Sequence, residues 1–396
     1  ETITISSMNS SLKFHNLSAA GRMMMKIKEV IFYHQAALTE KYGKQLLPSQ
    51  RKALDAMLAC RHNCGKFFTH CSHCGDQASI PLSCGHRSCP QCQNHLGKLW
   101  LERQKQKLLP VNYFMLTFTV PSQLRDLMWQ HQTIMYDLLF KAAIEAIKTL
   151  GRNNHGIELA ATGVLHTHRR DKGFHPHVHF IVPGGGLVKD KSGTSWKEVE
   201  EKFLINEFVL ANIFRAIFKK MLFKLEATQA LENQFSIPNM PNKWVAHIRS
   251  VGRGEKALNY LSRYLYRGVI SENDILTDVD QKVTFRYRES KTNITKTLSL
   301  PPEDFLWRLL RHVLPRGFRR VRDYGFLHAN AKRILMRVQL LLKVKLPEKA
   351  PEKKGLDCRV CGKTTDIILV VTQKTPMIFR FYQSPEIYPV DSTRPG

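Results

Sequence analysis

The chain has 396 residues, of which 60 are lysine or arginine and 33 are aspartate or glutamate, so its formal net charge is +27. Hydrophobic residues make up 43% of the chain, which excludes a basic disordered tail and leaves room for two or three folded domains. Such a charge favours a polyanionic partner, most simply nucleic acid; a ribosomal partner or an anionic membrane surface is the alternative. The apolar stretches are far shorter than the ~20 residues of a membrane helix, and no secretory leader is evident. We therefore expect a cytoplasmic protein.

Residues 1–110 are predicted to form a helical, zinc-binding and DNA-contacting domain. Helical spacing of apolar residues is found at 23–42, after Pro48 and again at 96–109. Seven of the nine cysteines lie between Cys60 and Cys92. In a cytoplasmic chain this density is typical of metal ligands rather than of disulfides.

Two close cysteine pairs form the strongest metal signal. The pairs have the spacing Cys-x-x-Cys and are separated by fourteen residues, which suits one tetrahedral Zn²⁺. The predicted ligands of this site are Cys71, Cys74, Cys89 and Cys92. The remaining cysteines allow a second zinc site whose fourth ligand is a histidine; the candidates are Cys60, Cys64 and Cys84 with His86, His70, His73 or His95. The later pair Cys358-x-x-Cys361 has no second pair beside it in sequence and is predicted to be incidental.

Residues 111–300 predict an α+β domain in which helices flank a small antiparallel sheet. Alternating or continuous apolar residues predict its strands, at 113–120, 163–168, 178–182, 244–251 and 283–287. Helical spacing predicts its helices, at 122–150, 198–225 and 254–267.

A histidine motif lies on one of these strands. His177 and His179 alternate with Val178, so both imidazoles project from one face and can bind one metal ion. On the preceding strand His166 and His168 also share a face, and either is a candidate third ligand.

Two tyrosines form a second candidate motif. Tyr260 and Tyr264 are four residues apart on a predicted helix, and Lys256 lies one turn earlier on the same face. Packing of both tyrosines into the core is the alternative. Beside a divalent ion and a cation, however, a phenol becomes a usable nucleophile.

Residues 301–396 predict a basic helical region that ends in a flexible tail. From residue 308 to 345 there are eleven lysines or arginines and one acidic residue, Asp323. This charge suits phosphate-backbone contacts, with aromatic residues available to stack on unpaired bases. A solvated helix face is the alternative.

The motifs taken in order resemble a known family. A Leu-Thr-Phe-Thr strand at 116–119, the His-Val-His triplet at 177–179 and the tyrosine helix resemble the three motifs of HUH endonucleases, named for histidine-hydrophobic-histidine. Within that group the chain resembles the two-tyrosine rolling-circle transposases of bacterial insertion sequences, the insertion-sequence ninety-one family. The resemblance covers about residues 45–330 and includes the segments 83–92, 183–186 and 260–264.

The resemblance implies an HUH endonuclease fold over 111–300 and a DNA transposase that nicks and rejoins single-stranded transposon ends. One tyrosine would attack phosphorus and form a 5′-phosphotyrosine, the second would cleave another strand, and Lys256 would favour the phenolate. A Mg²⁺ or Mn²⁺ ion would be held by His177, His179 and His166, and zinc would be structural. The implied partners are single-stranded DNA at transposon ends and target DNA in a bacterial nucleoid, with no membrane and no nucleotide cofactor.

Two positions depart from the family pattern. The chain has His168-Arg169-Arg170 where the family usually has Trp-Gly-Gln, and Ser88 where it often has histidine before Cys-Pro, so that His86 is the candidate substitute. Two other functions remain open. One is a plasmid replication initiator or relaxase of the same chemistry; the other is a non-catalytic zinc-dependent DNA-binding regulator, which would keep its activity without the tyrosines.

Overall fold

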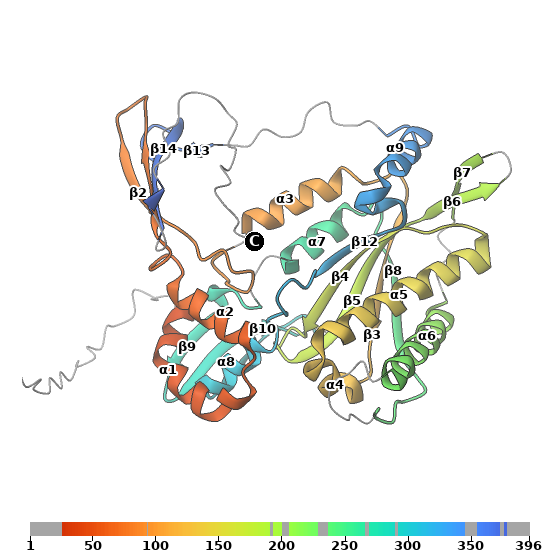
Figure 1. Cartoon of the computed structure of the whole chain (residues 1–396), viewed down its shortest axis with the longest axis horizontal. Helices are drawn as coiled ribbons and strands as arrows, with labels where there is room; N and C mark the ends of the chain where they lie inside the picture. The colour runs from red at the N-terminus through yellow and green to blue at the C-terminus, as the bar shows by residue number, and fades with distance from the viewer. Residues whose placement is uncertain are drawn as a thin grey trace, which may run out of the picture.

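The computed structural model describes residues 26–92, 94–190, 193–199, 206–228, 237–265, 269–289, 292–344, 355–372 and 376–377. The fold is a mixed α+β architecture with several antiparallel sheets, which confirms the predicted class (Figure 1). The predicted flexible tail, which begins after Gln383, lies outside the described residues. Within those residues, no helix combines the length and the apolar character that a membrane span requires.

A five-stranded antiparallel sheet forms the centre of the molecule, in the order β12-β4-β5-β3-β8. The strands predicted around the histidine motif are its middle strands, joined by a tight turn at 169–173. The strands of the sheet are β3 (Tyr113–Thr119), β4 (Ala161–His168), β5 (Phe174–Pro183), β8 (Val245–Ser250) and β12 (Val321–Tyr324).

One face of this sheet carries the largest hydrophobic core. Alternate residues of β3 and β5, among them Phe118 and Phe180, pack on apolar helix residues such as Phe140 and Phe214. Burying these aromatic side chains contributes on the order of 2 kcal/mol each. The helices on this face are α4 (Arg125–Gln130), α5 (Gln132–His155) and α6 (Glu207–Ala227).

The opposite face is covered by a second core. Leu258 and Leu261 of the tyrosine helix pack with Val164 and Ile181 of the sheet, and the helix also contacts the one that follows the cysteines. The elements on this side are α3 (Asn94–Lys105), α7 (Glu255–Leu265), α9 (Lys332–Leu341) and the hairpin β6 (Gly185–Asp190) with β7 (Gly193–Glu198).

A separate body is built from both halves of the chain. The N-terminal helices share one core with a three-stranded sheet and a later helix, so that α1 packs against α8. Its elements are α1 (Ile27–Tyr42), α2 (Pro48–Ala59), β9 (Ile275–Val279), β10 (Lys282–Arg288), β11 (Thr295–Leu300) and α8 (Pro302–Leu310). The domain boundaries at 110 and 300 stay a prediction, and this core contains residues from either side of both.

The last sheet joins the two ends of the described chain. Its main strands follow the order β13-β14-β1-β2, with β15 paired to β14. They are β1 (Lys66–His70), β2 (Gln77–Pro81), β13 (Leu356–Asp357), β14 (Thr364–Val371) and β15 (Pro376–Met377). We call this sheet the ribbon.

The sequence predicted a basic helical region after residue 301, but this region is not helical throughout. Between α8 and α9 the chain passes Pro315 and Gly317 and then forms the edge strand β12. Asp323 on this strand accepts hydrogen bonds from Thr162 (2.6 Å) and Lys107 (2.6 Å). Strand pairing and these polar contacts outweigh the local helical tendency.

Candidate active site

Three histidine side chains meet on the face of the central sheet that lies away from α5. His177 and His179 project from β5, and His166 projects from β4, where it pairs directly with His177. Their ligand nitrogens all lie within 4.8 Å of one another. The alternation of a strand accounts for this placement, because Val178 and Leu165 point into the core with α5.

Hydrogen bonds orient two of these rings. His177 Nδ1 donates to the carbonyl oxygen of His175 at 2.7 Å. His179 Nδ1 lies 2.8 Å from Oγ1 of Thr117, its pairing partner on β3. A ring held through Nδ1 leaves Nε2 for a metal ion, which is the usual arrangement of histidine ligands.

Burial favours the neutral form of the three imidazoles. Loss of solvent lowers the pKa of His166, His177 and His179, and for His166 and His179 the neighbouring imidazoles lower the pKa further. Only the neutral ring has a lone pair for a metal ion. The pKa shifts therefore favour the form of each side chain that can act as a ligand.

The donor set fits a divalent transition-metal ion. Imidazole nitrogen suits such ions, whereas Mg²⁺ prefers oxygen. Among the described residues, no carboxylate joins this group of three. Both ions that the resemblance implied, Mg²⁺ and Mn²⁺, favour oxygen ligands over imidazole, and Mn²⁺ is the transition metal of the two. A three-nitrogen site also leaves coordination positions for oxygen atoms of water or substrate.

Tyr260 faces the histidines from α7. Its ring centre lies 6.3 Å from that of His179, with the two planes nearly perpendicular at 87°. Leu258 and Leu261 anchor the helix on the sheet, which turns Tyr260 toward the open space beside it. The tyrosine is 37% exposed and so remains accessible to a substrate.

The other two predicted catalytic residues are placed differently. Lys256 is exposed one turn before Tyr260 on α7 and is not among the residues that line the cleft described below. The backbone of Tyr264 belongs to α7, but its side chain lies outside the described residues. The roles of Lys256 and Tyr264 stay predictions.

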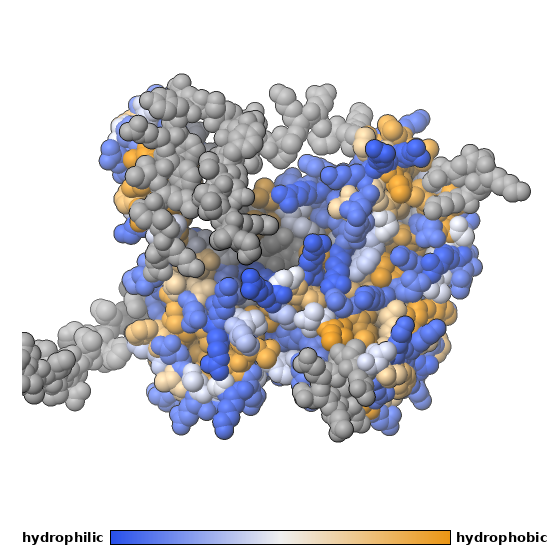
Figure 2. Space-filling view, in the orientation of Figure 1, coloured by the Kyte–Doolittle hydropathy of each residue, from blue (hydrophilic) through white to orange (hydrophobic). Residues whose placement is uncertain are grey.

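A cleft of about 1140 Å³ contains the three histidines and Tyr260 in its wall. It is lined on one side by the β4–β5 turn and on the other by β10. Figure 2 shows strongly hydrophilic residues gathered in the middle of this face, between the body of α1 and α2 and the central sheet. The cationic side chains of the wall are Arg169, Arg170, Lys172, Arg286 and Arg288, and its acidic residue is Asp274.

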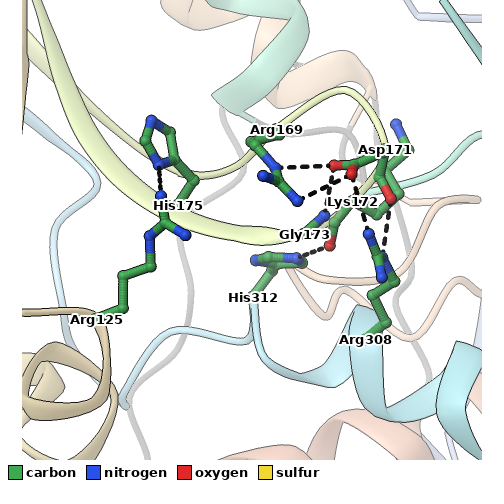
Figure 3. Close-up of polar contacts among 8 residues, drawn as sticks. All are labelled: Arg125, Arg169, Asp171, Lys172, Gly173, His175, Arg308 and His312. Atoms are coloured by element: carbon green, nitrogen blue, oxygen red, sulfur yellow. Dashed lines mark hydrogen bonds and ion pairs between the residues drawn. The ribbon is translucent and has the colours of Figure 1, made fainter. Parts of the chain in front are cut away.

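Two polar groups next to the three histidines were not among the site residues predicted from the sequence. Thr117 belongs to the Leu-Thr-Phe-Thr strand, which marked a motif without giving its threonine a role. His175 accepts a hydrogen bond at Nδ1 from Arg125 Nη2 at 3.0 Å. This contact lies away from the polar contacts of the β4–β5 turn (Figure 3). Burial lowers the pKa of His175 to about 4. The alternation 175, 177, 179 was the signal that would have placed His175 on this face.

The cysteines combine in pairs that differ from the prediction. Cys71 and Cys74 do not join Cys89 and Cys92; they meet Cys358 and Cys361, which the sequence reasoning treated as incidental. The distance between Cys71 Sγ and Cys361 Sγ is 3.6 Å, as is that between Cys74 Sγ and Cys358 Sγ. We call these four residues the ribbon cluster. The two pairs come together because β14 pairs with β1.

Cys89 and Cys92 belong to a second group, with Cys60 and Cys84. Cys92 Sγ lies 3.4 Å from Cys60 Sγ and 3.5 Å from Cys84 Sγ. We call these four the helix-side cluster, because Cys60 ends α2 and the group packs into the core of α1, α2 and α8.

Two predicted zinc ligands lie outside both clusters. Cys64 Sγ donates to the carbonyl oxygen of Ala59 at 3.2 Å. His86 Nδ1 accepts from the backbone N–H of Ser88 at 3.2 Å. A complete set of four sulfurs leaves no ligand position for either side chain.

A local signal in the sequence marks the true partners in the ribbon cluster. Cys71-x-x-Cys74 and Cys358-x-x-Cys361 are each followed by glycine, and both glycines have positive φ, 76° at Gly75 and 72° at Gly362. The N–H of each glycine donates to the carbonyl of the first cysteine of its pair, at 2.8 and 3.0 Å. The two turns are therefore alike, whereas Cys92 is followed by glutamine.

Comparison with known proteins agrees with this geometry. A family model described as "Putative transposase" matches residues 160–334, and one described as "Transposase zinc-binding domain" matches residues 30–120. The "Putative transposase y4qJ" of Sinorhizobium fredii is 32% identical over 318 residues, which are 74% of this chain and 79% of that protein. The transposase for insertion sequence element IS801 of Pseudomonas savastanoi pv. phaseolicola is 26% identical over 314 residues, 75% of each chain.

No solved structure matches this chain. The resemblance inferred from the motifs is confirmed by the two family models and the two relatives. The segment that matches the zinc-binding domain contains the whole helix-side cluster and two of the four cysteines of the ribbon cluster, and its helix α3 contacts α7, which carries Tyr260. The chain belongs to the IS91 family of transposases, with an N-terminal zinc-binding domain.

Proposed function

We propose that this transposase nicks and rejoins single-stranded DNA at transposon ends through a covalent tyrosine intermediate, during rolling-circle transposition. The observation that supports the proposal most strongly is the placement of Tyr260 beside three clustered histidines in a cationic cleft. Membership of a transposase family implies that the substrate is DNA. The HUH endonuclease fold is part of the same proposal and is supported by the two histidines on one strand of an antiparallel sheet.

His166, His177 and His179 would hold a divalent ion, Mn²⁺ or Mg²⁺. When bound, the ion supplies positive charge to the oxygens of the scissile phosphate. Thr117 and the carbonyl of His175 keep the two β5 rings in their binding orientation.

Tyr260 is the proposed nucleophile. Its phenol loses a proton, its oxygen bonds to phosphorus, the bond between phosphorus and O3′ breaks, and the released 3′ oxygen takes up a proton. The protein then carries a 5′-phosphotyrosine, and the energy of the phosphodiester is retained for rejoining. In this proposal Lys256 favours the phenolate, and Tyr264 attacks a second strand while Tyr260 is occupied.

Each four-cysteine cluster is proposed to hold one structural Zn²⁺. Four thiolates form a closed tetrahedral site without a position for substrate. Neither ion takes part in the reaction, and no nucleotide cofactor is required by this mechanism.

Covalent trapping tests the proposal. The protein is incubated with Mn²⁺ and a single-stranded oligonucleotide from the element's end, labelled at either its 5′ or its 3′ terminus, and run on a denaturing gel. We expect the 3′ label to move with the protein and the 5′ label to leave on a shorter fragment. The double variant Tyr260→Phe, Tyr264→Phe should form no adduct, whereas Tyr33→Phe, a change of an exposed tyrosine on α1, should form the normal amount.

The alternatives give different gels. Cleavage without an adduct would indicate a hydrolytic nuclease and would contradict the proposal. Tight binding without cleavage in the wild-type protein would favour the non-catalytic regulator. A replication initiator or relaxase would show the same adduct, but the transposase family of the chain argues against it.

A further inference from the structure

The three-stranded sheet β9–β10–β11 forms a wall of the cleft although it is not part of the central sheet. Its inner side packs on α1, α2 and α8 through Val283 and Phe285, which are fully buried. Its other side is exposed and polar; Thr284 and Ser299, for example, share a hydrogen bond at 2.8 Å. Neither the family resemblance nor the proposed mechanism gives this sheet a role.

Two arginines stand on the polar side of β10. Arg286 and Arg288 alternate with the buried residues, so both point away from the core and both line the cleft. Two positions along a strand place their backbones about 7 Å apart. They are therefore far enough apart to contact different phosphates of one nucleic-acid strand.

Each of these arginines is held through one nitrogen. Arg286 Nε lies 2.9 Å from Asp274 Oδ1, and Arg288 Nε donates to the carbonyl oxygen of Asn293 at 2.9 Å. A guanidinium group held by Nε still has two terminal nitrogens that match the fork of a phosphate. Holding the group in advance also lowers the entropy lost when a ligand binds.

The opposite rim of the cleft is the β4–β5 turn, which carries Arg169 and Arg170. Arg308 of α8 makes two contacts with Asp171 in this turn. Arg308 Nε donates to the carbonyl oxygen of Asp171 at 2.9 Å, and Arg308 Nη2 lies 3.2 Å from Asp171 Oδ2 (Figure 3). His312 Nε2 lies 2.8 Å from the carbonyl oxygen of Lys172. The body that contains β10 therefore also positions the turn, which keeps the two cationic rims in a defined relation.

The charge of the wall decides the class of ligand. Five cationic side chains line the cleft against one acidic residue, Asp274, which is already paired with Arg286. Such an excess suits a polyanion, and the hydroxyl group of Thr295 on β11 adds a neutral donor in the same cleft.

We propose that Arg286 and Arg288 of β10, with Arg170 of the facing turn, bind the phosphate backbone of the unpaired DNA strand next to the phosphate that Tyr260 attacks. This proposal rests on the proposed function, because it takes the strand in the cleft to be the one that is cut. The sheet β9–β11 then acts as a guide for the strand and makes no contact with the reacting atoms.

The salt dependence of binding tests the guide directly. Binding of a fluorescent single-stranded oligonucleotide is measured by anisotropy over a range of salt concentrations, in protein with its metals bound. Each phosphate contact contributes about 0.7 to the slope of log affinity against log salt, so Arg286→Gln with Arg288→Gln should lower that slope by about 1.4. The matched control, Lys141→Gln with Lys220→Gln, removes two exposed cations from α5 and α6 on the other side of the central sheet and should leave the slope unchanged.

A conservative pair separates charge from misfolding. Arg286→Lys with Arg288→Lys keeps both positive charges and should keep most of the slope, while the midpoint of thermal unfolding of all variants stays that of the wild type. A glutamine pair that binds with the wild-type slope would overturn the proposal, as would a control pair that loses as much slope.

Adduct formation at saturating oligonucleotide distinguishes the guide from the chemistry. If the wild type forms the tyrosine adduct and the glutamine pair also forms it once binding is saturated, the guide role is supported. If the wild type binds with the expected slope but never forms an adduct, the proposed function fails while the phosphate-binding wall stands. If the adduct forms and the slope does not depend on Arg286 and Arg288, the guide alone fails.

Discussion

The cysteine clusters and the histidine site place ligands around a centre in different ways. In each cysteine cluster four sulfurs from two chain segments surround one position, which leaves no place for a further ligand. In the histidine site three nitrogens lie on one sheet face, and the remaining side opens on the cleft with Tyr260. A closed site adds its binding free energy to folding, whereas an open site can receive a substrate oxygen. Under the proposed function, the four-ligand sites stabilise the fold and the three-ligand site carries the chemistry.

The largest expected effect comes from breaking the helix-side cluster. Cys89→Ser removes one of four sulfurs from a group that packs into the core of α1, α2 and α8. Binding of a structural zinc contributes an apparent ~10 kcal/mol or more to the free energy of folding. This part of the protein should therefore unfold at a denaturant concentration far below the wild-type midpoint. The measurement is chemical denaturation together with bound zinc, which should fall from two per chain to one.

Cys64→Ser is the matched control for this change. Cys64 lies in the same segment but outside both clusters, so the bound zinc and the denaturant midpoint should stay close to those of the wild type. A loss of zinc from Cys64→Ser, or two zinc ions in Cys89→Ser, would contradict the assignment of ligands.

The next effect concerns the open site. His177→Ala should lower the rate of adduct formation roughly a thousandfold, because the bound ion contributes several kcal/mol to the transition state. Zinc content and the unfolding midpoint should change little. His62→Ala, a change of an exposed histidine, should keep the normal rate. Equal loss of stability in His177→Ala and Cys89→Ser would remove the contrast between the two kinds of site.

A smaller effect is expected from the group that orients a ligand. Thr117→Val removes the hydroxyl beside His179 Nδ1 and keeps the shape of the side chain. Loss of such a partner typically costs 10–100-fold in metal affinity. The Mn²⁺ concentration for half-maximal nicking should rise by about that factor, while the rate at saturating Mn²⁺ stays within severalfold of the wild type. An unchanged Mn²⁺ requirement would mean that Thr117 does not position the ring.

The smallest effect on global stability is expected from the ribbon cluster. Cys358→Ser should release the zinc ion of the ribbon cluster. Without this ion the segment with Cys361 is no longer linked to Cys71 and Cys74, so β14 should become accessible to protease. In the part of the chain that the structure describes, the core of α1, α2 and α8 contains no residue of the ribbon cluster, so the main unfolding transition should shift much less than in Cys89→Ser. Limited proteolysis and the denaturation curve measure the two parts separately, and a shift as large as that of Cys89→Ser would show that the clusters are coupled.

The histidine site was accessible to sequence reasoning because its geometry is local. The alternation of β5 places His177 and His179 on one face, and a short hairpin brings His166 next to them. The α+β class followed from the same patterns. Tyr260 was found through the spacing of its helix, although only the packing of α7 on the sheet brings its ring near His179.

The cysteine pairing and the second wall of the cleft were not accessible in the same way. The prediction grouped Cys74 with Cys89 because they are close in sequence. In the structure Cys74 instead lies next to Cys358, which is 284 residues away, because β1 pairs with β14. The strand at 283–287 was predicted from its alternation, yet nothing local indicates that Arg286 would face the β4–β5 turn. Both features depend on how distant elements pack, which a single sequence encodes only through its turns and patterns.

The ribbon cluster also has a consequence for synthesis. Cys71 leaves the ribosome long before Cys361, which is 290 residues later. At 5–20 residues per second the first pair of thiols waits about 15 to 60 s for the second. During that interval β1 and β2 lack the strand that completes their sheet, and an ion held by Cys71 and Cys74 is open to exchange. A chain whose synthesis stops early keeps this half-site, so closure of the ribbon marks a polypeptide that has been made at least as far as its last cysteine.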